Sequence, residues 1–119
     1  TAVSNKMAFT RLQNATGNSI VPSDDSFAAA AASANWGASK DFFLIITNAP
    51  GDQSWPITAT NFILMYKKPK DVARSKIAKD FFSWTHANGA QQATALGYVP
   101  LPPALVQQIE AYWAKNMAF

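Results

Sequence analysis

The stretch that most constrains this chain spans residues 51–68, where a polar turn passes at once into a long apolar segment. Pro56 holds the preceding Trp55 in an extended conformation, because the proline ring clashes with a helical neighbour. Beyond this step most residues are aromatic or branched at Cβ, and the apolar run Phe62–Tyr66 is uninterrupted. Such a run is typical of a strand that is covered on both faces. A strand of this kind needs neighbours on either side.

The Trp-Pro step also separates two halves of different composition. Upstream, the chain is rich in alanine and has acidic residues at the expected start of a helix; downstream, it is rich in lysine and aromatic residues. Gly51 and Asp52 suit the turn before the step, since glycine tolerates a positive φ and aspartate can hydrogen-bond its own backbone. We therefore interpret the Trp-Pro step as a crossing between two structural units.

Length and composition are those of one ordinary domain. The chain has 119 residues, and 49% of them are hydrophobic, which is enough for a single core. The absence of cysteine excludes disulfides and thiolate metal sites. No run of about 18 apolar residues occurs, so no membrane insertion is expected. The sequence begins at Thr1 without an initiator methionine or an apolar leader, which indicates processing or a cut from a longer protein.

The first half predicts a strand, an alanine-rich helix and a second strand. We expect the first strand over residues 7–12, ending at a turn over residues 14–18. Ser23 can cap a helix that runs to about Ala34, because serine accepts backbone N–H groups and the aspartates after it suit the positive end of the helix dipole. Residues 40–47 carry a continuous apolar run in front of a turn, which predicts a buried strand.

The second half predicts three helices. The first runs from about Lys70 to Ala87 and ends at Gly89, where glycine accepts a left-handed conformation. A short helix over residues 90–96 and an extended segment over residues 98–102 follow. Pro103 pre-sets the first turn of the last helix, which reaches about Lys115. The expected packing stripe of the first helix is Ile77, Phe81 and Trp84, and that of the last helix is Leu105, Ile109, Tyr112 and Trp113.

A basic segment after the apolar run allows an alternative function. The net charge is +3, and it is partly concentrated beside aromatic residues that could stack on single-stranded nucleic acid. The alternative is therefore a free-standing interaction module for an anionic partner such as nucleic acid. The helical spacing of the interleaved apolar residues instead favours a solvated helix face. The basic residues concerned are Lys68, Lys70, Arg74, Lys76 and Lys79.

The residue types of an active site are largely missing. His86 is the only histidine, and neither a cysteine nor a carboxylate stands at a metal-ligand spacing from it; a position near a helix C-terminus fits a dipole partner equally well. Asp24 and Asp25 are adjacent, so their side chains diverge on a helix and cannot share a proton. The sequence contains no nucleophile elbow and no glycine-rich phosphate loop. We expect no catalytic residue, no metal site and no enzymatic activity.

Several motifs, in the same order, make the whole chain resemble the C-terminal portion of the periplasmic phosphate-binding proteins of phosphate ABC transporters. The Trp-Pro-Ile-Thr strand and the Phe-Phe-x-Trp helix are specific in combination. The motifs that carry the resemblance are residues 5–12 (NKMAFTRL), 22–28 (PSDDSFA), 54–58 (SWPIT) with Thr60, 62–64 (FIL), 81–84 (FFSW) and 97–102 (GYVPLP).

The resemblance implies an α/β chain that forms part of a two-lobed periplasmic-binding-protein fold of type II, with strands crossing at a hinge and a helical C-terminal half. Residues 1–54 would then be part of the second lobe, with a strand, the alanine-rich helix and a strand. Residues 55–119 would return to the first lobe as the crossing strand and the C-terminal helices. The implied hinge residues are Gly51, Ser54, Trp55, Pro56, Ile57 and Thr58.

The resemblance further implies a periplasmic receptor component that helps to deliver inorganic phosphate to an ABC importer. The family's phosphate ligands include an arginine followed shortly by Ser-Gly-Thr, and this chain has no such sequence. We therefore assign no phosphate ligand here, and expect phosphate to be bound by the complete receptor without another cofactor. The implied partners are the upstream half of the same receptor, or a second copy of this chain, and the membrane subunits of the transporter. Nucleic acid is not among them.

Overall fold

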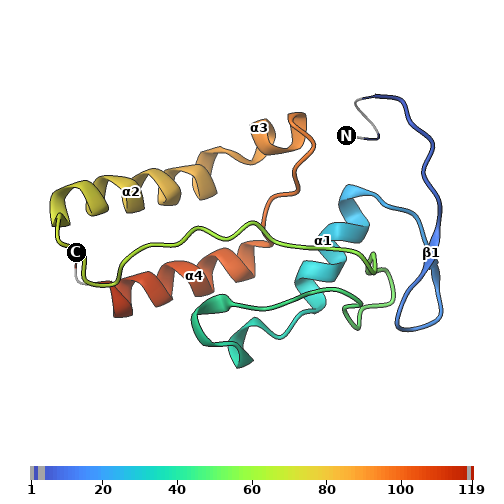
Figure 1. Cartoon of the computed structure of the whole chain (residues 1–119), viewed down its shortest axis with the longest axis horizontal. Helices are drawn as coiled ribbons and strands as arrows, with labels where there is room; N and C mark the ends of the chain where they lie inside the picture. The colour runs from blue at the N-terminus through green and yellow to red at the C-terminus, as the bar shows by residue number, and fades with distance from the viewer. Residues whose placement is uncertain (1, 3–4, 118) are drawn as a thin grey trace.

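The computed structural model describes residue 2, residues 5–117 and residue 119, and shows a mixed helical chain with one small sheet (Figure 1). Three longer helices are joined by extended segments; the two long C-terminal helices lie towards one end of an elongated body, and the hairpin and the first helix lie towards the other. No helix among the described residues is long and apolar enough to cross a membrane. The elements are β1 (Leu12–Gln13), β2 (Ser19–Ile20), α1 (Asp24–Ser33), the 3-10 turns η1 (Trp36–Ala38) and η2 (Lys40–Phe42), α2 (Val72–Asn88), α3 (Ala90–Ala95) and α4 (Pro103–Asn116).

The only sheet in the described part of the chain is a two-residue antiparallel hairpin. Leu12 pairs with Ile20 and Gln13 with Ser19, around the turn that the sequence predicted over residues 14–18. The strand predicted over residues 7–12 is wrong except at its last residue. Residues 7–11 lie exposed, without a strand beside them in the described structure. An extended segment without a partner cannot form the backbone ladder that defines a strand.

Helix α1 begins as the sequence predicted, because its first turn is closed by a reciprocal pair of serines. The Ser23 hydroxyl accepts from the Ser26 N–H at 3.3 Å, and the Ser26 hydroxyl accepts from the Ser23 N–H at 2.9 Å. The Ser26 hydroxyl also donates to the carbonyl of Val21. This capping box satisfies donors that a helix start would otherwise leave open. The small residues Ala30 and Ala31 are buried, which lets other segments approach the helix closely.

The buried strand predicted over residues 40–47 is wrong. Residues 40–42 form the 3-10 turn η2, with Asp41 and Phe42 at positive φ; residues 43–46 belong to no helix or strand, and Thr47 lies in a turn. Phe43 and Ile45 are 69% and 73% exposed, whereas Ile46 is 3% exposed. The apolar run is thus buried at alternate positions only. A strand covered on both faces needs a second layer, which the described chain does not supply.

The segment predicted as the central strand, residues 57–66, is extended but not part of a sheet. In Figure 1 it runs between α2 and α4 without a neighbouring strand. Its apolar side chains face solvent, and Leu64 is 94% exposed. The prediction of a paired strand is therefore wrong for the chain as it stands. The conformation agrees with the sequence pattern, whereas the neighbours that the pattern requires are missing from the described structure.

The three predicted C-terminal helices are present. Asp71 caps α2 by accepting from the Arg74 N–H at 2.9 Å, and Pro103 opens α4. Gly89 does not take the predicted left-handed conformation: its φ is −88°, and its N–H donates to the carbonyl of Thr85 at 2.8 Å. A Cβ at Gly89 would lie 2.7 Å from that carbonyl oxygen. Glycine is required there for the close approach, and α3 follows directly.

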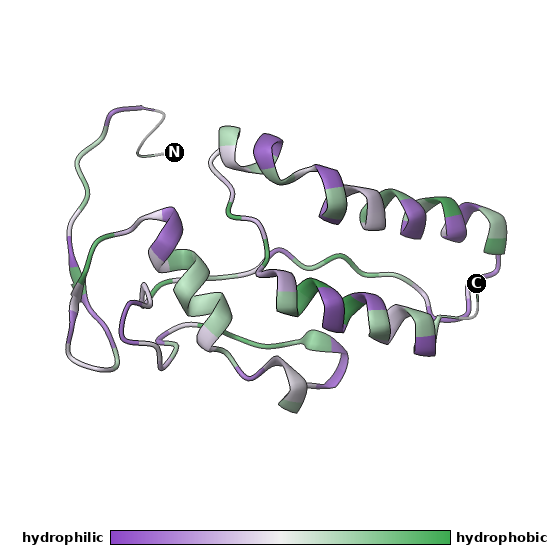
Figure 2. Ribbon diagram, turned by 180° about the vertical axis from the view of Figure 1, so that it is seen from behind, coloured by the Kyte–Doolittle hydropathy of each residue, from purple (hydrophilic) through white to green (hydrophobic). Residues whose placement is uncertain are grey.

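Helices α2 and α4 differ in how far their apolar stripes are covered. The α4 stripe is buried as predicted: Leu105 is in the core, and the other three residues are half-buried. The α2 stripe of Ile77, Phe81 and Trp84 is more than half exposed at every position, so its predicted packing is not made by this chain. In Figure 2 green apolar and purple polar residues alternate along α2.

A small core joins the two halves of the chain. It consists of Ala31, Trp36 and Ile46 from the first half and Leu105 from α4. The Trp36 indole donates to the Ala31 carbonyl at 2.7 Å, so its buried N–H is satisfied. This cluster holds α4 against the region of α1. The predicted assignment of residues 1–54 and 55–119 to two lobes stays a prediction.

The overall dimensions show that the chain is only partly covered by itself. Its radius of gyration is 16.2 Å, whereas a compact domain of this length has about 13.5 Å. Its accessible surface is 8531 Å², whereas a monomer of this mass exposes about 6,300 Å². Large apolar side chains contribute to this surface, including Ile45, Leu64 and Tyr66. The chain therefore exposes more surface than a compact domain of its length.

The capping box of α1 gives a first prediction. We expect Ser23→Ala to lower the free energy of unfolding by about 1 kcal/mol, because the Ser26 N–H loses its acceptor at a helix start. Urea unfolding followed by far-UV circular dichroism measures the change. Gln108→Ala, on the exposed face of α4, is the matched control and should leave the midpoint nearly unchanged. Equal midpoints for Ser23→Ala and the unaltered chain would contradict this role of Ser23.

Candidate functional site

The predicted hinge residues lie in a short segment, residues 51–58, which we call the joint. The joint packs on α1: the Trp55 N–H donates to the Ser26 carbonyl at 3.0 Å, and the Trp55 ring meets Phe27 edge-on at 6.5 Å. Ser54 is fully buried, and Trp55 and Thr58 are nearly so. Gly51 and Pro56 are half-buried, whereas Ile57 is exposed. The structure thus brings the predicted residues together, and their action as a hinge stays a prediction.

Gly51 is needed in the joint for a reason that the sequence did not reveal. Its φ is not positive; among the described glycines only Gly17 and Gly97 have a positive φ. A Cβ at Gly51 would instead lie 2.5 Å from the Ser54 hydroxyl and 2.9 Å from the Ser33 Cβ. The two hydroxyls of Ser33 and Ser54 hydrogen-bond each other at 3.2 Å. The predicted positive φ is therefore wrong, and close contact with α1 explains the glycine.

The Asn18 Nδ2 donates to the Asp52 carbonyl at 3.1 Å, but most of the hydrogen bonds between the hairpin and the joint come from one buried side chain, that of Asn14. Its Nδ2 lies within hydrogen-bond distance of three carbonyl oxygens of the joint: those of Gly51 (3.2 Å), Asp52 (2.9 Å) and Ser54 (3.4 Å). Its Oδ1 accepts from backbone and side-chain groups of the hairpin turn. Sequence reasoning treated Asn14 as a turn residue only. Its link to the joint depends on hydrogen bonds with residues 37 to 40 positions further along the chain, and the sequence gives no signal for such contacts.

Two further hydrogen bonds hold the C-terminal end of the joint. The Asn48 N–H donates to the Pro56 carbonyl at 2.8 Å, with Asn48 at a positive φ of 53°. The Thr58 hydroxyl donates to the Trp55 carbonyl at 2.8 Å. Beyond Thr58, the Thr60 hydroxyl is buried and has no hydrogen-bond partner in the described structure. The hydrogen bonds that hold the joint therefore end at Thr58.

A polar cluster lies at the other end of the extended segment. The Lys67 ammonium is 2.9 Å from the Asp41 carboxylate, and the Tyr112 hydroxyl of α4 donates to the same carboxylate. The hydrogen bond from Tyr112, followed by that from Lys67, holds the pKa of Asp41 below its usual value of 3.8. The pKa of Lys67 is raised above 10.5, first by Tyr112 and then by Asp41. These groups tie the end of the extended segment to α4 and η2.

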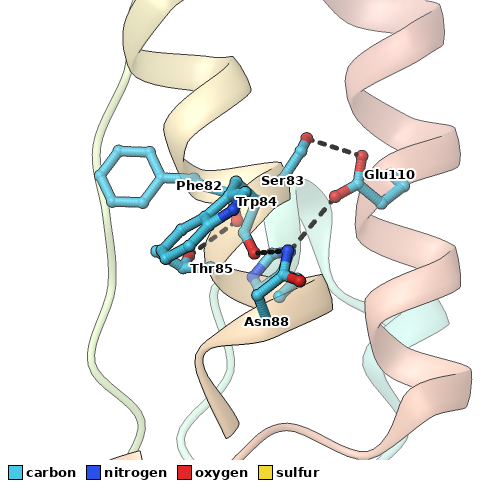
Figure 3. Close-up of polar contacts among 7 residues, drawn as sticks. Phe82, Ser83, Trp84, Thr85, Asn88 and Glu110 are labelled. Atoms are coloured by element: carbon cyan, nitrogen blue, oxygen red, sulfur yellow. Dashed lines mark hydrogen bonds and ion pairs between the residues drawn. The ribbon is translucent and has the colours of Figure 1, made fainter. Parts of the chain in front are cut away.

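Helix α2 is tied to α4 by one carboxylate, that of Glu110 (Figure 3). Its Oε2 accepts from the Ser83 hydroxyl at 3.1 Å, and its Oε1 lies 3.3 Å from His86 Nδ1. The His86 ring stacks on Trp113 with centroids 5.5 Å apart. His86 therefore has a carboxylate and a ring from the neighbouring helix, which replace the helix-dipole partner considered from sequence. No group of three or more possible metal ligands occurs in the described part of the chain.

The basic face considered for nucleic acid does not form one patch of free cations. Lys76 pairs with Asp80 at 2.5 Å, and Arg74 lies 3.9 Å from Asp71. Lys79 donates to the carbonyl of Phe119 at 2.8 Å. The positive charge is thus partly neutralised within and beside α2, as expected for a solvated helix face.

Two cavities adjoin the extended segment. The first, of about 280 Å³, lies between residues 60–67 and α4, and its walls include Trp36, Phe62 and Trp113. The second, of about 510 Å³, lies between residues 57–61 and residues 97–101. Their walls are mainly apolar, and neither gathers several cations or backbone N–H groups from a helix start. A tetrahedral anion needs such donors, so neither cavity has the chemistry of a phosphate site.

Comparison of the sequence with known proteins shows the class to which the chain is similar, namely phosphate-binding proteins. The phosphate-binding protein PstS of Xylella fastidiosa (strain 9a5c) is 61% identical over 97% of this chain. The PstS proteins of Pasteurella multocida (strain Pm70) and Haemophilus influenzae are 44% and 40% identical over 94% and 98% of it. No family model matches the chain.

These similarities confirm the resemblance seen in the motifs: over nearly its whole length the chain is a homologue of phosphate-binding protein PstS. The chain spans about a third of the relatives that it matches, with 32% of the Xylella protein and 35% of the Haemophilus protein covered. Its helices and small sheet are compatible with a fragment of such a protein.

The close contact at the joint gives a second prediction. We expect Gly51→Ala to lower the free energy of unfolding by about 1–3 kcal/mol, because the new methyl group forces Ser33 and Ser54 apart. Gly37→Ala is the matched control, since the nearest atom to its Cβ is 3.9 Å away. Urea unfolding followed by tryptophan fluorescence measures both variants. A Gly51→Ala variant as stable as Gly37→Ala would show that the joint does not hold α1 this closely.

The Asp41 cluster gives a third prediction. An NMR titration of the Asp41 carboxyl carbon should show a midpoint below 3.8, and Tyr112→Phe should raise it. Because the pKa is lowered on folding, the stabilising contribution of Asp41 is present above its unfolded pKa and is lost as the pH falls through the folded pKa. Tyr98→Phe, at an exposed position, should leave the midpoint unchanged. An Asp41 midpoint that does not respond to Tyr112→Phe would exclude the hydrogen bond as its cause.

Proposed function

We propose that this chain is the hinge and scaffold segment of a periplasmic phosphate-binding receptor that delivers inorganic phosphate to an ABC importer. The observation that carries the proposal is the 61% identity to a phosphate-binding protein over 97% of this chain, combined with its coverage of only 32% of that relative. The remaining two-thirds of such a receptor would complete the two-lobed fold of type II. The chain would act as a binding-protein component and not as an enzyme.

The proposal assigns the phosphate ligands to the part of the receptor outside this chain. Two observations support the assignment. The sequence has no arginine followed shortly by Ser-Gly-Thr, and the two cavities beside the extended segment lack converging anion donors. The lysines and arginine of α2 point into solvent or pair locally, so they do not form a cradle for a dehydrated anion.

The joint gives the chain its part in the receptor. One side of it is fixed on α1 by Trp55, Ser54 and the hydrogen bonds of Asn14. The other side continues into an exposed segment that lies along α4. Residues 51–58 would therefore carry the polypeptide from one lobe to the other. The membrane subunits of the importer would contact the assembled receptor rather than this segment alone.

Reconstitution tests the function, and is the fourth prediction. We expect isothermal titration of this chain with inorganic phosphate to show no micromolar binding. A second chain, comprising the two-thirds of the Xylella relative that this chain does not match, should show none by itself either. An equimolar mixture should bind phosphate, because the ligand groups and the scaffold are then both present. Sulfate at the same concentration is the control anion.

Two results would contradict the proposal. Micromolar phosphate binding by this chain alone would place ligands within it. A mixture that neither associates in sedimentation experiments nor binds phosphate would show that the chain is not the complement of the receptor's remaining part.

A further inference from the structure

We propose that Asn88 is a site of spontaneous deamidation, and that the last turn of α2 controls how fast it reacts. The inference concerns the covalent chemistry of this chain and is independent of the proposed function. Asn88 is the last residue of α2, and Gly89 separates that helix from α3. Of the eight asparagines in the sequence, only Asn88 is followed by glycine.

The reaction needs only water and two groups that are neighbours in the chain. The backbone nitrogen of Gly89 loses its proton to solvent and attacks the side-chain Cγ of Asn88, so a new C–N bond forms. The bond from Cγ to Nδ2 then breaks, Nδ2 takes up a proton from solvent, and ammonia leaves behind a cyclic succinimide. Water opens this ring at either carbonyl and gives aspartate or isoaspartate, with no oxidation or reduction. Glycine favours the attack, because it has no Cβ to crowd the nitrogen.

The fold itself requires the glycine that makes Asn88 reactive. Gly89 has a φ of −88° and a ψ of −2°, which other residues can also adopt. A Cβ at this position, however, would lie 2.7 Å from the carbonyl oxygen of Thr85. That oxygen belongs to the backbone of α2 and cannot move away without disturbing the helix. A larger residue, which would slow the attack, therefore does not fit at the junction of α2 and α3.

Two hydrogen bonds hold both reacting groups in the folded chain. The Gly89 N–H, which must lose its proton, donates to the Thr85 carbonyl at 2.8 Å. The Asn88 Nδ2, which must leave as ammonia, donates to the Trp84 carbonyl at 3.0 Å (Figure 3). Both bonds span the last turn of α2. The reaction therefore has to wait until this turn opens.

The last turn of α2 is placed to open more readily than the rest of the helix. Ala87 and Asn88 are exposed, whereas the contacts that tie α2 to α4 come from Ser83 and His86, before the helix end. Helix ends fray at a lower cost in free energy than global unfolding. Asn88 should therefore react in the folded chain, although about tenfold more slowly than in the unfolded chain, because the hydrogen bonds must break first.

The product changes both the charge and the backbone of the junction. A neutral amide becomes a carboxylate, so one negative charge is added to the formal net charge of +3 and leaves +2. The new carboxylate stands at the negative end of the α2 dipole and cannot donate to the Trp84 carbonyl. Isoaspartate also adds a methylene group to the main chain, which shifts the Gly89 N–H away from Thr85. We expect deamidation to loosen α3 from α2.

Peptide mapping by mass spectrometry tests this site, and is the fifth prediction. The whole chain is incubated at mildly alkaline pH, once in buffer and once in urea, and the deamidation of each asparagine is followed over time. We expect Asn88 to react first in both solutions, and about tenfold more slowly in buffer than in urea. Electron-transfer fragmentation should identify isoaspartate as well as aspartate at position 88.

Glycine substitutions test whether the helix end controls the rate. We expect Ala87→Gly to raise the rate in buffer about threefold to fivefold, because glycine weakens the last turn, and to leave the rate in urea unchanged. Ala73→Gly makes the same change at an exposed position in the first turn of α2 and is the matched control. It should change neither rate.

A second variant tests what the product does to α3. Hydrogen exchange of the α3 amides should become faster as Asn88 is converted during the incubation. Asn88→Gln keeps the amide but closes such a ring far more slowly, so α3 should exchange at a constant rate over the same time. Faster exchange in Asn88→Gln as well would show that the loosening of α3 has another cause.

The outcomes that overturn the inference do not involve phosphate. Another asparagine that reacts before Asn88 in the folded chain would refute the assignment of the site. Equal rates in buffer and urea, or equal effects of Ala87→Gly and Ala73→Gly, would show that the last turn of α2 does not control the reaction. Each of these results would leave the proposed function as it stands.

Discussion

The docking of the joint on α1 is the contact on which the rest of this structure depends. The Trp55 N–H and the Ser54 hydroxyl are both satisfied by groups of α1, those of Ser26 and Ser33. Ser26 has a second task, because its hydroxyl also closes the capping box at the start of the helix. The start of α1 and the path of the chain past Pro56 are therefore fixed by neighbouring atoms. The extended segment that follows the joint therefore starts from a fixed position.

The parts of the fold that could be predicted from the sequence are those determined by residues close to one another in the sequence. Ser23 and the aspartates after it mark the start of α1, and Pro103 marks that of α4, because caps and fixed φ angles act within one helical turn. The hairpin turn was found for the same reason. The stripe of α4 was also correct, since Leu105 and its helical neighbours reach a core that this chain provides.

The strands could not be predicted in the same way, because a strand is defined by its partner. Residues 42–46 and 62–66 have the composition of covered strands, but the described chain supplies no strands beside them. At the joint, the sequence indicated Gly51 and Trp55 but not Asn14 or Ser33. Those two act across 21 to 40 residues, and neither residue type nor spacing encodes such a contact. The reason for Gly51 became clear only from the position of Ser33.

The tight fit at Gly51 has a consequence for motion. With no room for even one methyl group between the joint and α1, residues 51–56 must travel with that helix as one rigid body. If the two lobes of a receptor rotate about this crossing, the torsion angles that change lie past Thr58, because the last hydrogen bond of the joint is made there. The pivot would then coincide with the beginning of the extended segment, so opening and closing would change the backbone torsion angles next to Thr60 rather than those of the joint.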